Sequence, residues 1–554
     1  MTDASSSAAV DEPFRPWRAQ RILARQSGLL VVDKPSGIPT HGGEPGSDVV
    51  SRLKALLSSP AQQLYLGVHQ RLDLGTSGVL AFCTDEARNK EVADAFASGG
   101  VRKRYVAAVE LSAKSPLSVS NELELRHLLE PDGRLQRVTK RGGKPCVAHA
   151  RVLRRVQRRA LVELRPQTGR THQLRVQLAA EGAAIAGDTD YAGAPAARLL
   201  LHAASLSLLG HDFVAEVPAS FERWLEGREP LLGARAEVAR KLSDAACLRY
   251  PLIASNSVLR WVNGVGDELP GVEVDWYDGF VSLAVSSAEA SSRAEELAEL
   301  LHELGARGVY LKQRAKSDLR QQDVNELAPP LPVRGEAAPS SFPVNEGALR
   351  VNIELGDGLS TGLFVDQRDN RRRLSGSCHG QRVLNLFSYT CSFSVAAALG
   401  GAARVVSVDL SKRALRRGEE NFRLSGLDPG PHAFIAEDAV RYLERTGQRG
   451  DRFDWIVLDP PSFSTSGKGK VLRVAEDYER LVQLALSVLA DGGRLLAVTN
   501  HRGTSEAALH AIVQRSARAL GRRVQQVKSV NSGVDCPAGF EGPHPSKAVL
   551  LTLG

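Results

Sequence analysis

The chain has 554 residues, a length that exceeds what a single hydrophobic core supports, so several domains are expected. Its 71 lysines and arginines against 63 aspartates and glutamates leave a net charge of +8, which favours a polyanionic partner. The six cysteines lie far apart without a Cys-x-x-Cys pair, which argues against a zinc site or a disulfide framework and predicts a cytoplasmic protein.

The first part of the chain begins with small and polar residues that lack the apolar run of a signal peptide, and we predict a disordered tail over 1–18. Short apolar runs separated by turn signals then predict a mainly antiparallel α+β domain over 19–227. The charged segment 228–247 is interpreted as a linker. No stretch reaches the ~18 apolar residues of a membrane span.

Two further units follow. A small α+β module is predicted over 248–326, with a hairpin around the Asp278-Gly279 pair that is typical of tight turns. The segment 327–343 is rich in proline, alanine and serine and is predicted to be a mobile linker. Strands alternate with helices over 344–554, which predicts a parallel sheet covered by helices on both faces.

The N-terminal domain contains a candidate catalytic carboxylate. Asp73 lies between an apolar strand and a Gly-Thr-Ser-Gly turn in VHQRLDLGTSG, where a carboxylate is presented at the end of an element. An aspartate in this position also serves commonly as a turn or cap residue, so the local pattern leaves both interpretations open.

Motifs that surround Asp73 resemble those of a known family. VVDKPSGIPTH, HQRLDLGTSG, RPQTGRTHQLRVQL and RLLLHAASLSL occur in the order shown by RluA-type pseudouridine synthases and extend over 28–209. The resemblance implies an α+β pseudouridine synthase fold that needs no cofactor. It further implies that Asp73 is catalytic, that Tyr105 lies against the target base and assists proton removal, and that Arg170 reaches across the flipped base to the aspartate. His172 is expected to be structural.

The C-terminal unit contains a candidate nucleotide-binding loop. RVLNLFSYTCSFS carries a strand into a loop of small and hydroxyl residues, and Asp409 ends the next strand, where a carboxylate can accept hydrogen bonds from ribose hydroxyls. This arrangement fits a dinucleotide or S-adenosylmethionine. The loop lacks the spaced glycines of a dinucleotide fingerprint, which argues against a nicotinamide cofactor. Asp438 follows the third strand, and Asp459-Pro460-Pro461 follows the fourth.

Two longer strings in this half, TGLFVDQRDNR and RWVNGVGDELPGVEVDWYDG, resemble RlmI/RlmK-type ribosomal RNA methyltransferases from about Leu248 to the C-terminus. The resemblance implies a PUA-like or hairpin module before a Rossmann-like class I methyltransferase domain that binds S-adenosylmethionine and acts on RNA. It implies that the cofactor is bordered by Phe364, Asp366, Gln367, Arg368, Asn385, Phe387, Ser388, Thr390, Asp409, Asp438 and Asp459. The substrate base would contact Pro460, Pro461 and Asn500.

Chemistry narrows the choice of the base atom that accepts the methyl group. Methylation at carbon 5 of cytosine requires a thiolate that adds to the ring. The usual positions for such a cysteine, the Asp-Pro-Pro segment and the strand LLAVTNHRG, contain none. Asn500 and His501 stand there instead, which favours a ring nitrogen of a purine, and Cys391 is expected to have a packing role.

The sequence therefore predicts a bifunctional enzyme that forms pseudouridine and methylates a base, with ribosomal RNA as the expected partner and no metal site. Two alternatives remain: one half is a non-catalytic platform that binds RNA, or the synthase acts on transfer RNA. Basic clusters such as Arg154–Arg159 could follow a phosphate backbone or be solvated surface.

Overall fold

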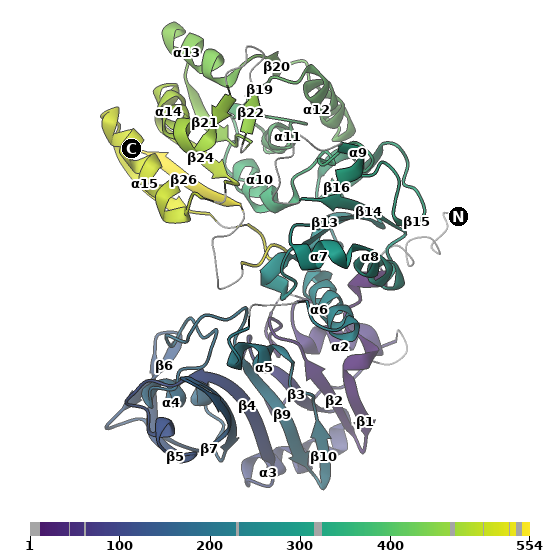
Figure 1. Ribbon diagram of the computed structural model, residues 1–554, viewed down its shortest axis with the longest axis vertical. Coiled ribbons are helices and arrows are strands. Elements are labelled where there is room, and N and C mark those ends of the chain that lie inside the picture. Colours follow the sequence, from purple (N-terminus) through teal and green to yellow (C-terminus); the bar gives the residue numbers. More distant parts are fainter. Residues whose placement is uncertain are drawn as a thin grey trace.

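The computed structural model describes residues 12–43, 45–59, 63–228, 232–314, 324–461, 463–465, 471–501, 503–530, 532–538 and 546–554. It has two lobes (Figure 1). The N-terminal domain forms one lobe, the C-terminal domain lies at the far end of the other, and the middle module packs between them.

The N-terminal domain is built on a ten-stranded sheet in which most neighbours are antiparallel, as predicted. Strand β3 pairs with β9 in parallel. The strands are β1 (Ile22–Gln26), β2 (Leu29–Lys34), β3 (Ser77–Cys83), β4 (Arg102–Glu110), β5 (Glu122–Asp132), β6 (Leu135–Thr139), β7 (Lys144–Val156), β8 (Arg159–Pro166), β9 (Leu201–Leu208) and β10 (His211–Val214). The helices are α2 (Val49–Leu57), α3 (Asn89–Ala97), α4 (Gln173–Ala180) and α5 (Ser220–Leu225).

The middle module has a five-stranded sheet, and its hairpin turns at Asp278 and Gly279 as predicted, with φ angles of 48° and 97°. Its strands are β11 (Val258–Asn263), β12 (Val272–Tyr277), β13 (Phe280–Val285), β14 (Gly308–Gln313) and β15 (Arg334–Gly335). Its helices are α7 (Ala288–Ser292) and α8 (Ala294–Glu303). One face of this sheet packs against the helices and α6 (Arg235–Ile253).

Three segments differ from the sequence prediction. The segment interpreted as the first linker contains most of α6, whose apolar side chains are buried in the middle module, while Cys247 packs in the N-terminal core. The segment predicted as a tail is ordered from residue 12: Phe14 is buried between Trp261 and Trp276 of the module. Residues 1–11 lie outside the described residues. The second linker contributes the edge strand β15 to the module.

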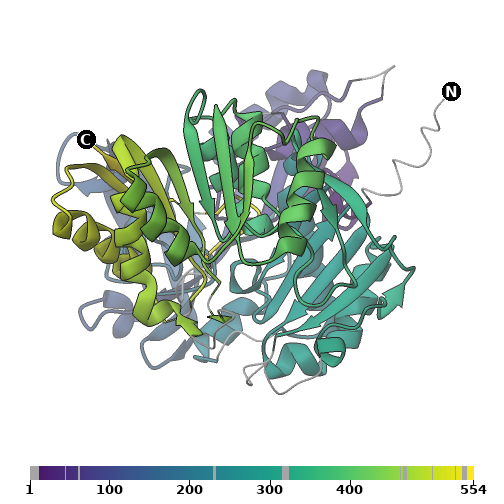
Figure 2. The same cartoon turned by 90° about the horizontal axis from the view of Figure 1, so that it is seen from above.

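The C-terminal domain is the doubly wound unit that the sequence predicts. Its sheet runs in the order β20-β19-β18-β21-β24-β26-β25, parallel except at β26 and β25. The strands are β18 (Arg382–Leu386), β19 (Arg404–Asp409), β20 (Ala433–Ala436), β21 (Phe453–Leu458), β24 (Leu489–Thr499), β25 (Val524–Ser529) and β26 (Lys547–Leu553). The helices are α10 (Arg368–Ser375), α11 (Ser392–Leu399), α12 (Lys412–Leu424), α13 (Ala439–Arg449), α14 (Val474–Ser487) and α15 (Glu506–Ala519). They cover both faces of the sheet (Figure 2).

The remaining α-helix and strands are short. They are the helix α9 (Val324–Leu327), the hairpin of β16 (Phe342–Glu346) with β17 (Leu349–Ile353), and the hairpin of β22 (Phe463–Thr465) with β23 (Val471–Arg473). The β16–β17 hairpin packs between the module and α12.

Candidate active sites

Asp73 is the first residue of a tight turn that leads into β3. The amide of Thr76 donates to the carbonyl of Asp73 over 3.0 Å, which closes the turn. The Asp73 side chain is 28% exposed. The carboxylate is therefore fixed by its backbone and remains accessible to a substrate.

The KPSGIPT segment, residues 34–40, holds this turn in place through hydrogen bonds. It follows the buried strand β2 and supplies donors to carbonyls on either side of Asp73. These bonds are Thr40 Oγ1 to Leu72 O (3.0 Å), Lys34 Nζ to Leu74 O (3.1 Å), Gly37 N to Leu74 O (2.9 Å) and Ser36 Oγ to Gly75 O (2.8 Å). Burial lowers the pKa of Lys34 to about 7, and the negative charge of Asp73 opposes this shift.

The arginine beside Asp73 is Arg175, which the sequence analysis did not select. Its guanidinium nitrogen lies 3.8 Å from Asp73 Oδ2, and it also binds Asp188 in a bidentate pair with two bonds of 2.7 Å. Asp190 accepts a third bond at 2.9 Å. Arg170, the predicted partner, lies on an exposed turn before α4, where its amide donates to Gln173 Oε1.

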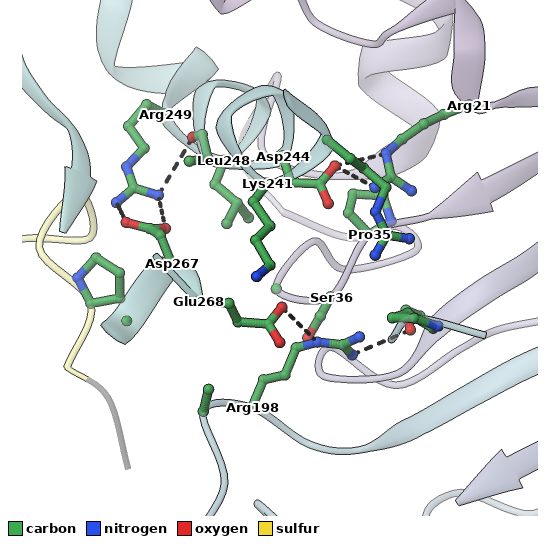
Figure 3. A pocket seen from close by; sticks show the side chains of 18 of the residues that line it. Arg21, Pro35, Ser36, Arg198, Lys241, Asp244, Leu248, Arg249, Asp267 and Glu268 are labelled. Carbon is green, nitrogen blue, oxygen red and sulfur yellow. Dashed lines mark hydrogen bonds and ion pairs between the residues drawn. The ribbon is translucent and has the colours of Figure 1, made fainter. Parts of the chain in front are cut away.

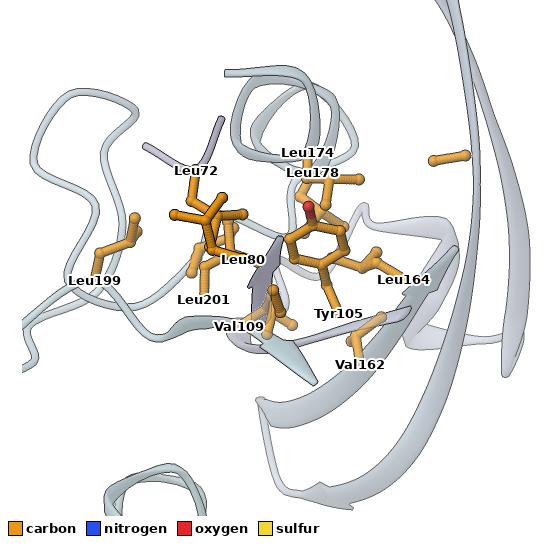
Figure 4. Close-up of a cluster of buried hydrophobic side chains, with 14 of the residues drawn as sticks. Leu72, Leu80, Tyr105, Val109, Val162, Leu164, Leu174, Leu178, Leu199 and Leu201 are labelled. Atoms are coloured by element: carbon orange, nitrogen blue, oxygen red, sulfur yellow. The ribbon is translucent and has the colours of Figure 1, made fainter. Parts of the chain in front are cut away.

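Tyr105 lies on β4 in the core beneath the Asp73 turn. Figure 4 shows its ring among leucines, with the hydroxyl directed towards α4, which carries Leu174 and Leu178. The side chain is 8% exposed. Burial and the negative charge of Asp73 raise the pKa of Tyr105, so its hydroxyl stays protonated at neutral pH.

His172 has a structural position. It precedes α4 with a positive φ of 53°, and its Nδ1 lies 3.0 Å from the Tyr191 hydroxyl. The helix begins there because the left-handed residue reverses the chain after the exposed turn that holds Arg170.

The basic cluster at 154–159 is engaged within the protein. Arg154 pairs with Glu222 and Glu226, Arg155 donates to the carbonyls of Leu117 and Ser118, and Arg159 donates to the carbonyl of Trp224. These arginines are therefore bonded within the protein, whereas the sequence left a phosphate backbone and solvated surface open as their environment.

The predicted cofactor loop has a strained backbone. Phe387, Tyr389 and Cys391 all adopt positive φ, at 55°, 47° and 62°. Such conformations are costly for residues other than glycine and concentrate at ligand sites. Asp409 stabilises the loop, because its Oδ2 accepts from the Tyr389 amide at 2.9 Å and its Oδ1 from the Ser411 amide at 2.8 Å.

The other predicted cofactor residues divide into two groups. Some are buried and bonded within the protein: Gln367 to Ser546, Arg368 to Asp535, Asn385 to Ser394, and Thr390 to the carbonyl of Gly362, with Ser388 bonded through its amide to Val408. These side chains shape the loop. In the other group Phe364 is exposed, and the remaining members are half-buried: Asp366, Phe387, Asp409, Asp438 and Asp459.

In this second group, the charge of Asp366 acts on the carboxyl of Asp459. Burial and the negative charge of Asp366 raise the pKa of Asp459 to about 7, while Arg371 acts in the opposite direction. Asp438 caps α13 by accepting from the Arg441 amide at 3.1 Å. A site with two neighbouring carboxylates and a ribose acceptor fits S-adenosylmethionine, which carries positive charge on its sulfonium and amino groups.

A cavity of about 200 Å³ adjoins Asp366 at the contact between the middle module and the C-terminal domain. Asp366, Phe364 and Asn500 line one side. The module supplies the other side with residues that the sequence analysis did not select: Arg260, Asp275, Tyr277 and Arg314. Pro460 is buried and Pro461 is exposed. Of the predicted base-binding residues, only Asn500 lines this cavity.

All six cysteines are free and buried. Burial raises the pKa of Cys391 to about 12 and that of Cys378 to about 11, and it also raises the pKa of Cys536. A raised pKa suppresses the thiolate that nucleophilic addition requires. The Cys391 side chain packs under the loop with Gly418 against it, in keeping with a packing role.

A larger cavity of about 360 Å³ separates the N-terminal domain from α6 and the C-terminal half (Figure 3). Most of the arginines that line this cavity form ion pairs. These pairs are Arg198 with Glu268 at 3.2 Å, Arg249 with Asp267 at 2.7 Å, and Arg21 with Asp244. Arg249 also donates to the carbonyl of Asp535, the residue that pairs with Arg368. This polar seam joins the two halves.

None of the helices in the described residues combines the length and the hydropathy of a membrane span. Within the same residues, no group of three or more histidine, cysteine, aspartate or glutamate side chains is arranged to hold a metal ion.

The chain matches a family model of RNA pseudouridylate synthases over residues 28–180 and one of S-adenosylmethionine-dependent methyltransferases over residues 267–540. Ribosomal RNA large subunit methyltransferase I from Aeromonas salmonicida is 32% identical over 307 residues, which are 55% of this chain and 77% of that protein. The protein of the same name from Escherichia coli K12 is 32% identical over 279 residues, 50% of this chain and 69% of that protein. A solved methyltransferase in complex with SAH, SMU.776, is 25% identical, with a TM-score of 0.53 over 61% of this chain and 85% of that chain.

Proposed function

We propose that this chain, which belongs to the S-adenosylmethionine-dependent methyltransferase family of ribosomal RNA large subunit methyltransferase I and carries an RNA pseudouridylate synthase domain before it, modifies large-subunit ribosomal RNA in two ways. The N-terminal domain converts a uridine to pseudouridine, and the C-terminal domain methylates a purine. The single observation that carries the proposal is that each domain holds its own accessible carboxylate site, at Asp73 and at Asp409.

Pseudouridine formation needs a group that acts on the sugar and a group that holds the base. The bond between C1′ and N1 breaks, the uracil turns, a bond between C1′ and C5 forms, and the C5 proton is lost. Asp73 acts either as a nucleophile at C1′ or as the base that starts elimination. Arg175 positions its carboxylate from α4, and the protonated Tyr105 hydroxyl lies on the side of the base.

Bound S-adenosylmethionine supplies an electrophilic methyl group to the C-terminal site. Asp409 accepts from the ribose, Asp438 lies where the adenine is bound, and Asp366 with Asp459 faces the positive charge of the donor. Asn500 lines the adjoining cavity, where the acceptor base binds. A purine ring nitrogen is already nucleophilic, which agrees with cysteines whose thiol pKa values are raised.

The test uses the purified full chain with an unmodified transcript of large-subunit ribosomal RNA and S-adenosylmethionine. Nucleoside mass spectrometry of the digested RNA is expected to show both pseudouridine and a methylated purine. Without S-adenosylmethionine, only pseudouridine is expected. Methylation at carbon 5 of cytosine instead would refute the assigned acceptor, and a transfer RNA transcript in a parallel reaction tests the alternative substrate of the synthase.

A further inference from the structure

A segment of the C-terminal domain, residues 354–364, lies between the middle module and the cofactor loop. It follows β17, and the Glu354 amide donates to the Thr361 carbonyl over 2.9 Å, which closes most of the segment into a loop. At its end, the exposed Phe364 side chain lies beside the Tyr389 ring of the cofactor loop, with centroids 5.7 Å apart. The conformation of this segment therefore decides where Phe364 stands at the proposed donor site.

Tyr277, at the end of β12, joins the module to this segment through its hydroxyl. The hydroxyl lies 2.8 Å from Thr361 Oγ1, and both side chains are buried. Burial and the negative charge of Asp275 raise the pKa of Tyr277, so its hydroxyl keeps its proton. Tyr277 and Thr361 line the same cavity as Phe364 and Asp366. This hydrogen bond thus lies at the wall of the proposed methyltransferase site.

Lys312, on β14, is a second contact from the module. Its Nζ donates to the Leu355 carbonyl at 2.7 Å and to the Gly358 carbonyl at 2.5 Å. The side chain is 1% exposed, and burial lowers the pKa of Lys312 to about 8. Burying an ammonium group costs free energy, and an apolar side chain of similar volume would avoid that cost. Packing therefore does not explain the lysine, whereas the two carbonyls of the segment do.

The C-terminal domain fixes the other side of the segment. Thr390 Oγ1 donates to the Gly362 carbonyl at 2.6 Å, and Arg371 donates to the Phe364 carbonyl at 2.9 Å. Gly362 has a φ of 121°, a conformation that other residues rarely adopt. The segment is thus held between the two units, and its conformation depends on contacts from both.

We propose that Tyr277 and Lys312 are positioning residues of the methyltransferase site, which hold the 354–364 segment in the conformation that binds S-adenosylmethionine. Both act through the segment, so neither is a catalytic residue. The inference rests on the proposed methyltransferase function. When either contact is removed, only a fraction of the molecules holds the segment correctly, and the apparent Kd rises by the reciprocal of that fraction.

The experiment is calorimetric titration of the full chain with S-adenosylmethionine. We expect Tyr277→Phe and Lys312→Met each to raise the Kd about 5- to 20-fold. The matched controls are Tyr310→Phe and Lys241→Met. Tyr310 is a buried tyrosine of β14 whose hydroxyl accepts from a backbone amide, and Lys241 is a buried lysine of α6 that donates to a backbone carbonyl. Both controls should keep the Kd within about twofold of the unaltered protein.

A second set of variants tests the hydrogen bond from the side of the segment. Thr361→Val should raise the Kd as Tyr277→Phe does, and the double variant should raise it no further, because one bond is lost in each case. Thr361→Ser retains the hydroxyl and should bind like the unaltered protein. In kinetics on RNA, KM for S-adenosylmethionine should rise while kcat changes less than about threefold, and pseudouridine formation by the same variants should not change.

An unchanged Kd in either Tyr277→Phe or Lys312→Met would overturn the positioning role. Losses of the same size in the two controls, or additive losses in the double variant, would overturn it as well. Failure of the unaltered protein to bind S-adenosylmethionine or to methylate RNA would instead overturn the proposed methyltransferase function.

Discussion

The two arginines of the TGRTHQLR motif show how far a residue can be assigned from sequence. Arg170 lies shortly before His172 and Arg175 shortly after it, but the backbone places them in different environments. Arg170 lies on an exposed turn, while Arg175 lies in α4 and contacts Asp188. The left-handed conformation of His172 creates this difference, and no local pattern encodes it. Asp73 was identifiable because several ordered motifs surround it.

The different burial of these arginines gives opposite expectations for the same substitution. Arg175→Gln leaves the fully buried Asp188 without its partner and should lower the free energy of unfolding by about 3–5 kcal/mol. Arg170→Gln should leave stability within about 0.5 kcal/mol and raise KM for RNA. Urea unfolding and steady-state kinetics check both. A stability loss in Arg170→Gln as large as that in Arg175→Gln would contradict the assignment.

The Asp366–Asp459 pair predicts a pH dependence of donor binding. The pKa of Asp459 is raised to about 7, so its carboxyl is largely protonated at pH 6 and ionised at pH 8. A cationic donor prefers the ionised form, so affinity for S-adenosylmethionine should rise about tenfold from pH 6 to pH 8. Calorimetric titration measures this. The Asp459→Asn variant should show a flat profile, and a flat profile in the unaltered protein would refute the coupling.

Two segments join the lobes, helix α6 and the segment around Phe14, and the sequence analysis predicted neither of them. In α6, Val238, Leu242 and Ala245 follow helical spacing, but the charges between them resemble a linker. Phe14 and Trp17 are two isolated aromatic residues in a polar segment, so they show no periodicity that would reveal their burial. The sheets were predictable because their apolar runs are long. Contacts between distant segments, such as Arg249 with Asp535, depend on packing that no window of sequence contains.

The N-terminal segment is expected to stabilise the middle module. Phe14 packs on Trp261 and Trp276 with ring centroids 5.4 and 5.1 Å away. Phe14→Ala should therefore lower the free energy of unfolding by about 3–5 kcal/mol, as monitored by tryptophan fluorescence in urea. The control is Phe364→Ala, since Phe364 is 44% exposed and should lose less than about 1 kcal/mol. Equal midpoints for the two variants would show that the segment does not belong to the core.

At the scale of the whole molecule, the two sites lie in separate lobes, joined by α6 and the polar seam (Figure 1). Each has its own carboxylate, so we expect the activities to separate. Asp73→Asn should abolish pseudouridine formation and leave methylation intact. Asp409→Ala should do the reverse, because it removes the ribose acceptor and two loop contacts. Both are measured by nucleoside mass spectrometry of the same RNA. Loss of both activities in either folded variant would contradict independent sites.

The most direct test of a bifunctional enzyme is nucleotide-resolution mapping of pseudouridine and methyl marks on total RNA from cells with and without the gene. We predict that one uridine and one purine of large-subunit ribosomal RNA both lose their marks, and that Asp73→Asn restores only the methyl mark. Loss of a single class of mark would contradict it and would make the other half a platform for binding RNA.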